Sequence, residues 1–216
     1  MNGDFAMNRL MRTTLPLFAF AFILGACVPS SKPRNKIEFY TLEYSLSQKP
    51  GTKAIPAVIR IERFSVAPMY NTTRMIYRDS TFKRSAYVLH KWRANPGNLV
   101  TYFLSRDIKQ SGLYKAIIPH DSGFPSNYVL EGSVDEFFEW DTAREWKAVL
   151  SVAITLMARD EPDISKRVLF QKSYRAIKPC KEKNPSALAR AMSLCMKEVS
   201  ADILKDVYAV LKNHNP

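Results

Sequence analysis

Several residue types that can catalyse reactions or bind metals occur in the chain, but their spacing fits no known active site. His90, His120 and His214 are isolated, with no second His or Cys three or four residues away, so we predict no metal site. Ser133 lies in Glu-Gly-Ser-Val-Asp, which lacks the second glycine of a nucleophile elbow, and it falls inside an expected strand. We interpret Ser133 as a buried or edge serine.

Phosphate-binding loops and paired acids offer no stronger indication of catalysis. The chain has only seven glycines and no Walker-type sequence, so we predict that it does not hydrolyse ATP itself. Asp135, Glu136 and Glu139 lie near one another, and a solvated strand face explains them. We therefore expect no enzyme activity, no bound metal and no cofactor.

Cys27 has the most specific chemistry in the sequence. It follows Leu24-Gly-Ala at the end of the apolar run Leu15–Leu24, which two arginines precede. Such a run is too short to span a bilayer but suits a signal peptide, and small residues before a Cys resemble a bacterial lipobox. We predict cleavage before Cys27 and acylation of its sulfur and new amino group, which together give a stable anchor. The alternatives are an ordinary signal peptide with a chance Cys, or an uncleaved anchor.

This site divides the chain into three parts: a signal peptide at 1–26, a lipidated flexible tether at 27–36 and one domain at 37–216. The tether is polar, cationic and contains prolines, which suits an extended linker. Translation starts at Met1 or Met7, and the sequence does not decide between them.

The positive charge belongs to the domain. Cleavage before Cys27 removes two arginines and one aspartate, so the net charge changes only from +12 to +11. We expect no nucleic acid outside the inner membrane, so this charge should attract anionic lipid headgroups, lipopolysaccharide or an acidic partner. The alternative is a well-solvated cationic surface.

Cys180 and Cys195 form an even pair once Cys27 carries lipid, and an oxidising compartment permits a disulfide between them. Cys180 lies in the loop before the last expected helix, and Cys195 lies about three turns into that helix. A disulfide between them would link this loop covalently to the helix. The alternative is two buried free thiols, because sequence does not give the Cα separation that a bridge requires.

Hydrophobic periodicity indicates a single domain in which two main helices pack on one mixed sheet. Helical spacing of apolar residues begins after Asn95-Pro96 and ends at Gly112, and a second helical stripe runs from Asn184-Pro185 to about Leu211. Aromatic and β-branched runs predict strands at 37–46, 57–67, 75–78, 86–90, 114–118, 128–140, 146–159 and 166–176. This order of elements is typical of an α/β or α+β fold.

Four aromatic residues flank the expected turn at 141–145: Phe137, Phe138, Trp140 and Trp146. Strand alternation puts Phe137 and Phe138 on opposite faces, so one interpretation is that at least one of these rings, or a turn tryptophan, is exposed as a candidate partner contact. The other interpretation, which we favour, is that a helix covers these rings.

The order and spacing of short motifs resemble the ABC-type transport auxiliary lipoproteins of the paraquat-inducible protein C type. The motifs are Phe39-Tyr-Thr-Leu42, Ile59-Arg-Ile61, Val66-Ala-Pro68, Met75-Ile-Tyr-Arg78, Trp92-Arg-Ala-Asn-Pro96, Ser111-Gly-Leu-Tyr114 and Tyr128 to Phe138. The resemblance covers the chain from about Phe39 to the last helix. Two features depart from the pattern: the basic Lys91-Trp-Arg93, and the pair Cys180 and Cys195.

This resemblance implies a small α/β domain similar to the N-terminal domain of TolB and no active site. It further implies a periplasmic lipoprotein on the outer membrane, working beside a mammalian-cell-entry (MCE) protein and its permease and ATPase in lipid transport. Val28 after Cys27 is not an inner-membrane retention Asp, which agrees with outer-membrane sorting. Some members resemble ring-forming oligomers, so a homo-oligomer is one of the arrangements implied.

Two functions therefore stand side by side. The first is a non-enzymatic subunit that receives or braces an MCE tunnel and supports envelope integrity. The second is a periplasmic lipid- or glycan-binding lipoprotein that acts alone, for which the charged domain is the motivating feature. An envelope hydrolase is disfavoured because no nucleophile and base are paired.

Overall fold

The computed structural model describes residues 36–45 and 53–214. The chain divides into the units Met1–Lys36 and Ile37–Pro216, and all described helices and strands belong to the second. Cys27, the signal peptide and the tether lie outside the described residues, so the expectations for them stay predictions.

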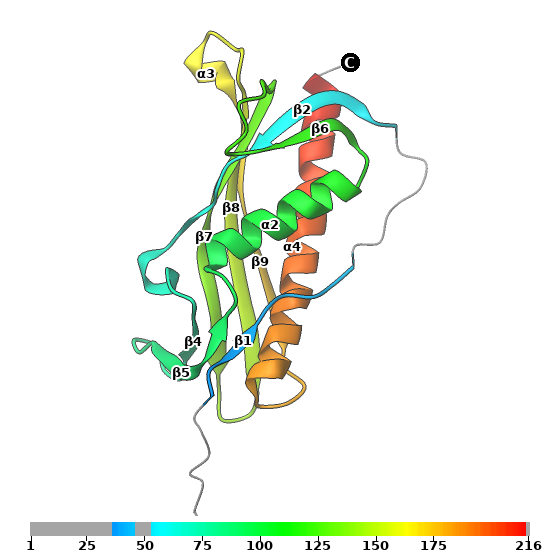
Figure 1. Cartoon of the computed structure of the whole chain (residues 1–216). Helices are drawn as coiled ribbons and strands as arrows, with labels where there is room; N and C mark the ends of the chain where they lie inside the picture. Colours follow the sequence, from blue (N-terminus) through cyan, green and yellow to red (C-terminus); the bar gives the residue numbers. More distant parts are fainter. Residues whose placement is uncertain (1–35, 46–52, 215–216) are drawn as a thin grey trace, which may run out of the picture. The chain divides into compact units, whose positions relative to one another are not determined.

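A mixed nine-stranded sheet forms the centre of this unit (Figure 1). Its strands are β1 (Glu38–Tyr40), β2 (Ile55–Ile61), β3 (Ser65–Val66), β4 (Arg74–Arg78), β5 (Ser85–Trp92), β6 (Tyr114–Pro119), β7 (Tyr128–Asp141), β8 (Trp146–Ala158) and β9 (Val168–Pro179). The helical elements are η1 (Pro68–Tyr70), α2 (Pro96–Gln110), α3 (Ile164–Arg167) and α4 (Pro185–His214).

The long strand β7 organises the sheet. Along one edge it pairs in parallel with β2, β3 and β4 in turn, and along the other it pairs antiparallel with β8. β6 extends the sheet beyond β2, β5 and β1 extend it beyond β4, and β9 lies outside β8. The expected mixed sheet in a single α/β domain is confirmed.

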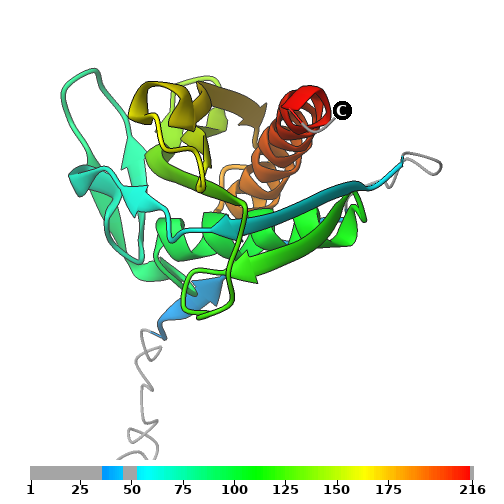
Figure 2. The same cartoon turned by 90° about the horizontal axis from the view of Figure 1, so that it is seen from above.

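The two long helices are the ones that periodicity predicts. α4 lies along β8 and β9, and α2 contacts β6, β7 and α4. Figure 2 shows β2 and β6 side by side next to α2. The buried stripe of α4 recurs every three or four residues and faces the sheet: Leu188, Met192, Cys195, Val199, Ile203, Val207 and Leu211. The short helix α3 is an addition to the elements expected from sequence.

The ends of both helices follow from their residues. The Asn95 side chain accepts a hydrogen bond from Gly97 N at 2.9 Å, Pro96 occupies the first turn, and Gly112 has a φ of 65° just beyond α2. Glycine ends a helix in this left-handed conformation with the least strain. At α4, the Asn184 side chain accepts from Ala187 N at 2.8 Å.

One expected strand, 57–67, is divided into β2 and β3. Ile61 pairs with Leu130 and Ser65 with Ser133, so four steps along one chain match three along the other. The extra residue bulges out of the ladder, as in a β-bulge. This irregularity turns Phe64 into the core, where it is buried.

Candidate functional site

The aromatic residues beside the β7–β8 turn are buried or half-buried. Phe137 and Phe138 point to opposite faces of β7, but both rings are buried. The Trp92 ring meets Phe137 edge-on with centroids 5.1 Å apart, and Tyr70 of η1 stacks on Phe138 at 5.6 Å. Of the two interpretations, the covered one holds for both phenylalanines, because Trp92 packs on one face of the sheet and Tyr70 on the other. Trp140 and Trp146 are half-buried.

Arginines that no functional motif of the sequence indicates lie against these rings. The guanidinium of Arg78 lies 4.4 Å from the Trp140 ring centre and 5.4 Å from that of Phe138. Arg84 lies 5.3 Å from the same Phe138 ring. Lys147 adds a third cation, 5.8 Å from Trp140. We call Arg78, Arg84, Phe138 and Trp140 the arginine–aromatic cluster.

On the face of β7 opposite Phe138 and Trp140, the residue between them in sequence carries a buried carboxyl group. Glu139 is fully buried, and the Tyr87 hydroxyl donates to its two carboxylate oxygens at 3.0 and 3.1 Å. Burial raises the pKa of Glu139 to about 7, although the hydrogen bond from Tyr87 acts in the opposite direction. The expectation of a solvated face at Glu139 is wrong, because Tyr87 of β5 covers it.

A second buried carboxylate, Asp107, joins three segments. Its Oδ2 accepts hydrogen bonds from the Tyr44 hydroxyl at 2.6 Å and from Ser200 Oγ at 2.7 Å. Its Oδ1 accepts from Arg106 Nε at 2.9 Å and Nη2 at 2.8 Å. This network ties α2 to α4 and to the segment after β1, so we assign it a structural role.

Cys180 and Cys195 are free thiols in the structure. Cys195 Sγ donates a hydrogen bond to Ala148 O at 3.5 Å. Burial raises the pKa of Cys180 to about 11 and that of Cys195 to about 12, so neither reacts readily as a thiolate near neutral pH. A disulfide between them stays a prediction, which intact mass with and without reductant checks.

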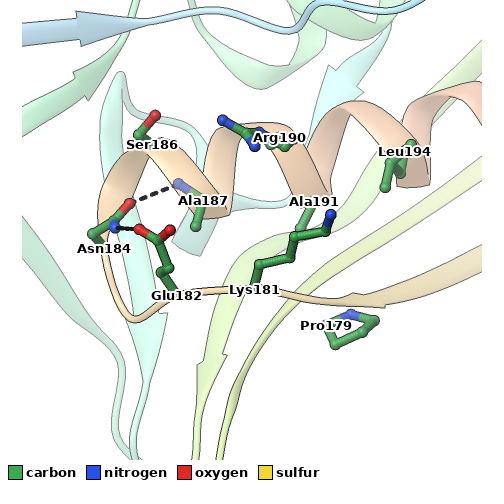
Figure 3. Close-up of a pocket in the computed structure, with 9 residues that line it drawn as sticks. All are labelled: Pro179, Lys181, Glu182, Asn184, Ser186, Ala187, Arg190, Ala191 and Leu194. Carbon is green, nitrogen blue, oxygen red and sulfur yellow. Dashed lines mark hydrogen bonds between the residues drawn. The ribbon is translucent and has the colours of Figure 1, made fainter.

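The described part of the chain has small or open hollows. One of about 130 Å³ lies where β9 leads into α4 (Figure 3). There Asn184 Nδ2 donates to Glu182 Oε2 at 2.6 Å, next to the capped first turn of the helix. A larger open groove of about 570 Å³ runs over β7 to β9 and has a polar lining that includes Glu62, Arg63 and Gln171.

Within residues 36–45 and 53–214, His, Cys, Asp and Glu form no group of three or more that could hold a metal. His90, His120 and His214 come from β5, the loop after β6 and the end of α4. Ser133 lies within β7 and its hydroxyl donates to Asp135 Oδ1 at 2.6 Å. In the same described part, no helix is long and apolar enough to cross a membrane.

Comparison with solved structures shows the fold. Protein XCC0632 from Xanthomonas campestris has a similar structure, with a TM-score of 0.74 and 15% identity over 82% of this chain and 98% of that one. An uncharacterised protein matches with a TM-score of 0.62 and 11% identity over 80% of this chain and 99% of that one. A comparison with curated protein sequences finds no match.

Comparison with protein families gives the identity that the motif order suggested. The family model described as the ABC-type transport auxiliary lipoprotein component matches residues 40–204, which run from the end of β1 to within α4. The match covers most of the chain and nearly all of its described domain. The chain therefore belongs to the ABC-type transport auxiliary lipoprotein family.

Proposed function

We propose that the protein is a non-enzymatic subunit of an MCE-type lipid transport system between the inner and outer membranes. In this role it is anchored through Cys27 to the periplasmic face of the outer membrane, and its domain binds the MCE protein or its permease and ATPase. The observation that carries the proposal is the family match over residues 40–204. The transporter components supply the energy, and the lipoprotein supplies attachment.

The partnership is tested by recovering the tagged lipoprotein from crosslinked cells. Recovery of an MCE or transporter component, identified by mass spectrometry, supports the proposal. The matched control is a second tagged lipoprotein of the same envelope, which should recover none of them. Recovery of neither component with the protein of interest contradicts the proposal.

The anchor is tested by Cys27→Ser. We expect the variant to leave the membrane fraction and to lack the mass of the acyl chains, because serine offers no sulfur for diacylation. Cys180→Ser is the matched control and should stay in the membrane fraction. Unchanged fractionation and unchanged mass of the Cys27 variant would contradict lipidation.

The stand-alone binding protein remains the second candidate, and the open polar groove over β7 to β9 favours it. A glycan suits such a surface because hydroxyl and carboxylate side chains match its hydroxyl groups. Gene neighbourhood separates the two functions. Adjacent permease, ATPase and MCE genes favour the transport subunit, and a solitary gene favours the stand-alone protein.

A further inference from the structure

Two arginines face each other across the β4–β5 hairpin. Ile76 pairs with Ala86 and Tyr77 with Ser85, so the next step of this register brings Arg78 opposite Arg84. Like charges directly opposite each other destabilise an antiparallel pair. Both guanidinium groups nevertheless lie over the Phe138 ring, at 5.4 and 5.3 Å from its centre. The fold therefore holds two positive charges close together on one aromatic surface.

Neither arginine has a carboxylate partner among the described residues. The nearest acid along the chain, Asp79, pairs instead with Lys83 at 3.4 Å. The Nε atoms of Arg78 and Arg84 are buried and have no hydrogen-bond acceptor. Arg84 Nη1 donates only weakly placed bonds, at 3.3 Å, to two carbonyl oxygens of its own loop. Buried donors without acceptors are costly, and the outer N–H groups of the same two guanidiniums, which pair with no carboxylate among the described residues, can donate to an oxyanion with several oxygens.

The same hairpin exposes two apolar residues, one in its loop and one on β5. The Phe82 side chain is 98% exposed, and Val88 on β5 is 75% exposed. Phe82 is followed directly by Lys83 and Arg84. An exposed aromatic ring next to cations is typical of surfaces that insert into the interface of an anionic membrane. There the ring contacts the boundary of the acyl chains and the cations contact phosphate groups.

The direction in which the chain enters the domain indicates that this end of the domain lies nearer the membrane. β1 runs parallel to β5, with Glu38 beside His90, so the chain enters the domain from the side of the hairpin tip (Figure 1). Only the ten residues Cys27–Lys36 separate the proposed acylated Cys from the domain. Ten residues span at most about 35 Å when fully extended. An anchor at Cys27 thus keeps the start of the domain within about 35 Å of the membrane surface.

We propose that Arg78 and Arg84 bind the phosphate of an anionic phospholipid headgroup while Phe82 enters the membrane interface. The orientation part of this inference rests on the proposed anchor at Cys27, but the lipid site does not require an MCE partner. Arginine suits a phosphate because its guanidinium presents several N–H donors in a planar fork. The aromatic ring beneath holds the two forks in place.

The test uses the mature chain with Cys27→Ser, so that acyl chains do not cause binding. Vesicles of phosphatidylcholine with phosphatidylglycerol are compared with vesicles of phosphatidylcholine alone. We expect binding to the anionic vesicles only, and a loss of roughly tenfold or more in affinity for Arg78→Gln/Arg84→Gln. The matched control, Lys115→Gln/Lys212→Gln, removes two exposed charges from β6 and the end of α4 and should lose less than about threefold. Equal losses in the two double variants would overturn the site.

A second variant tests the placement of the hairpin even if Arg78→Gln/Arg84→Gln does not fold. Phe82→Trp changes an exposed ring, and its fluorescence should shift to shorter wavelength when anionic vesicles are added. No shift while the protein is bound would overturn the placement of the hairpin. Binding of glycerol phosphate or inorganic phosphate without any vesicle binding would overturn the membrane source of the phosphate. If Arg78→Gln/Arg84→Gln still binds vesicles but no longer recovers the transporter from crosslinked cells, the site binds a protein partner and the lipid proposal is overturned. If the parent protein binds anionic vesicles but recovers no transporter component, only the proposed transport role is contradicted.

Discussion

At the scale of single residues, Glu139 makes stability depend on pH. Its pKa in the folded protein is raised by burial from 4.5 to about 7. Between these values the folded protein keeps a proton that the unfolded chain has released, so the free energy of unfolding falls as pH rises through this window. Above about pH 7 the loss is complete and amounts to at most about 3 kcal/mol.

Glu139→Gln should remove this dependence, because an amide keeps the shape of the protonated acid and does not ionise. We expect the variant to match the parent near pH 4 and to exceed its stability at pH 8, as measured by urea unfolding at both values. Glu131→Gln, at an exposed position of the same strand, is the control and should leave the pH profile unchanged. Parallel profiles for Glu139→Gln and the parent would contradict the burial effect.

The sequence does not predict this residue's environment, and the reason is physical. Alternation along β7 places Glu139 on the face of Phe137, but it does not say that Tyr87 lies above it. The same holds for the arginine–aromatic cluster: its rings stand out in the sequence, whereas Arg78 and Arg84 come from a distant hairpin. A charged turn with arginines at equal distances from its centre is the signal that could have drawn attention to them.

At the scale of elements, Gly132 lets two layers approach closely. A Cβ atom at this position would lie 2.3 Å from Ala153 O and 2.5 Å from Cε1 of Phe64. Gly97 at the start of α2 has the same relation to the Phe64 segment, where a Cβ would lie 2.5 Å from Phe64 O. The bulge between β2 and β3 thus requires glycine on both of the elements that it touches.

Gly132→Ala should destabilise the domain by about 3 kcal/mol, because the clash involves backbone as well as a packed ring. Gly123→Ala is the matched control: a Cβ there meets nothing within 4 Å, so its effect should stay within about 0.5 kcal/mol. Thermal or urea unfolding of the two variants measures the difference. A Gly132 variant as stable as the Gly123 variant would contradict this packing.

Elements with strong periodicity are those that the sequence predicts best. α2, α4 and the β7–β8 hairpin agree with their expected ranges because apolar spacing, proline and glycine all point to the same boundaries. The break between β2 and β3 is not predictable in this way, since it depends on the register of each strand against β7. The first expected strand, 37–46, is observed only as Glu38–Tyr40. Leu42 lies beyond its end and is buried all the same.

At the scale of the whole molecule, Asp107 connects parts that are distant in sequence. Asp107→Ala should destabilise the protein by about 3 to 5 kcal/mol, because it leaves Arg106 and two hydroxyl donors without their acceptor. Asp202→Ala, an exposed acid on α4, is the control and should have little effect. Urea unfolding measures both changes. A small effect of Asp107→Ala would mean that water replaces the network.

The arrangement of strands is the part of the fold that sequence leaves undetermined. Periodicity identifies which residues of β8 face the core, and Leu150, Val152, Ile154 and Leu156 are all buried as expected. It does not identify neighbours, because any apolar strand can pair with any other. That β2, β3 and β4 share one edge of β7 follows only from the three-dimensional structure.

The central place of β7 also determines when the chain can fold. Its partners β2, β3 and β4 precede it, but each pairs with a residue of β7 more than 60 positions later in the sequence. Pairing over such separations is slow, because the entropy lost on closing a long loop precedes the contacts that compensate for it. β2 can pair with β6 and β4 with β5 before β7 is available, but the edge of β7 that joins β2, β3 and β4 is complete only when Asp141 has emerged. On the proposed export route, the strands that cross the inner membrane first therefore lack the pairing that joins them into one sheet until β7 follows them.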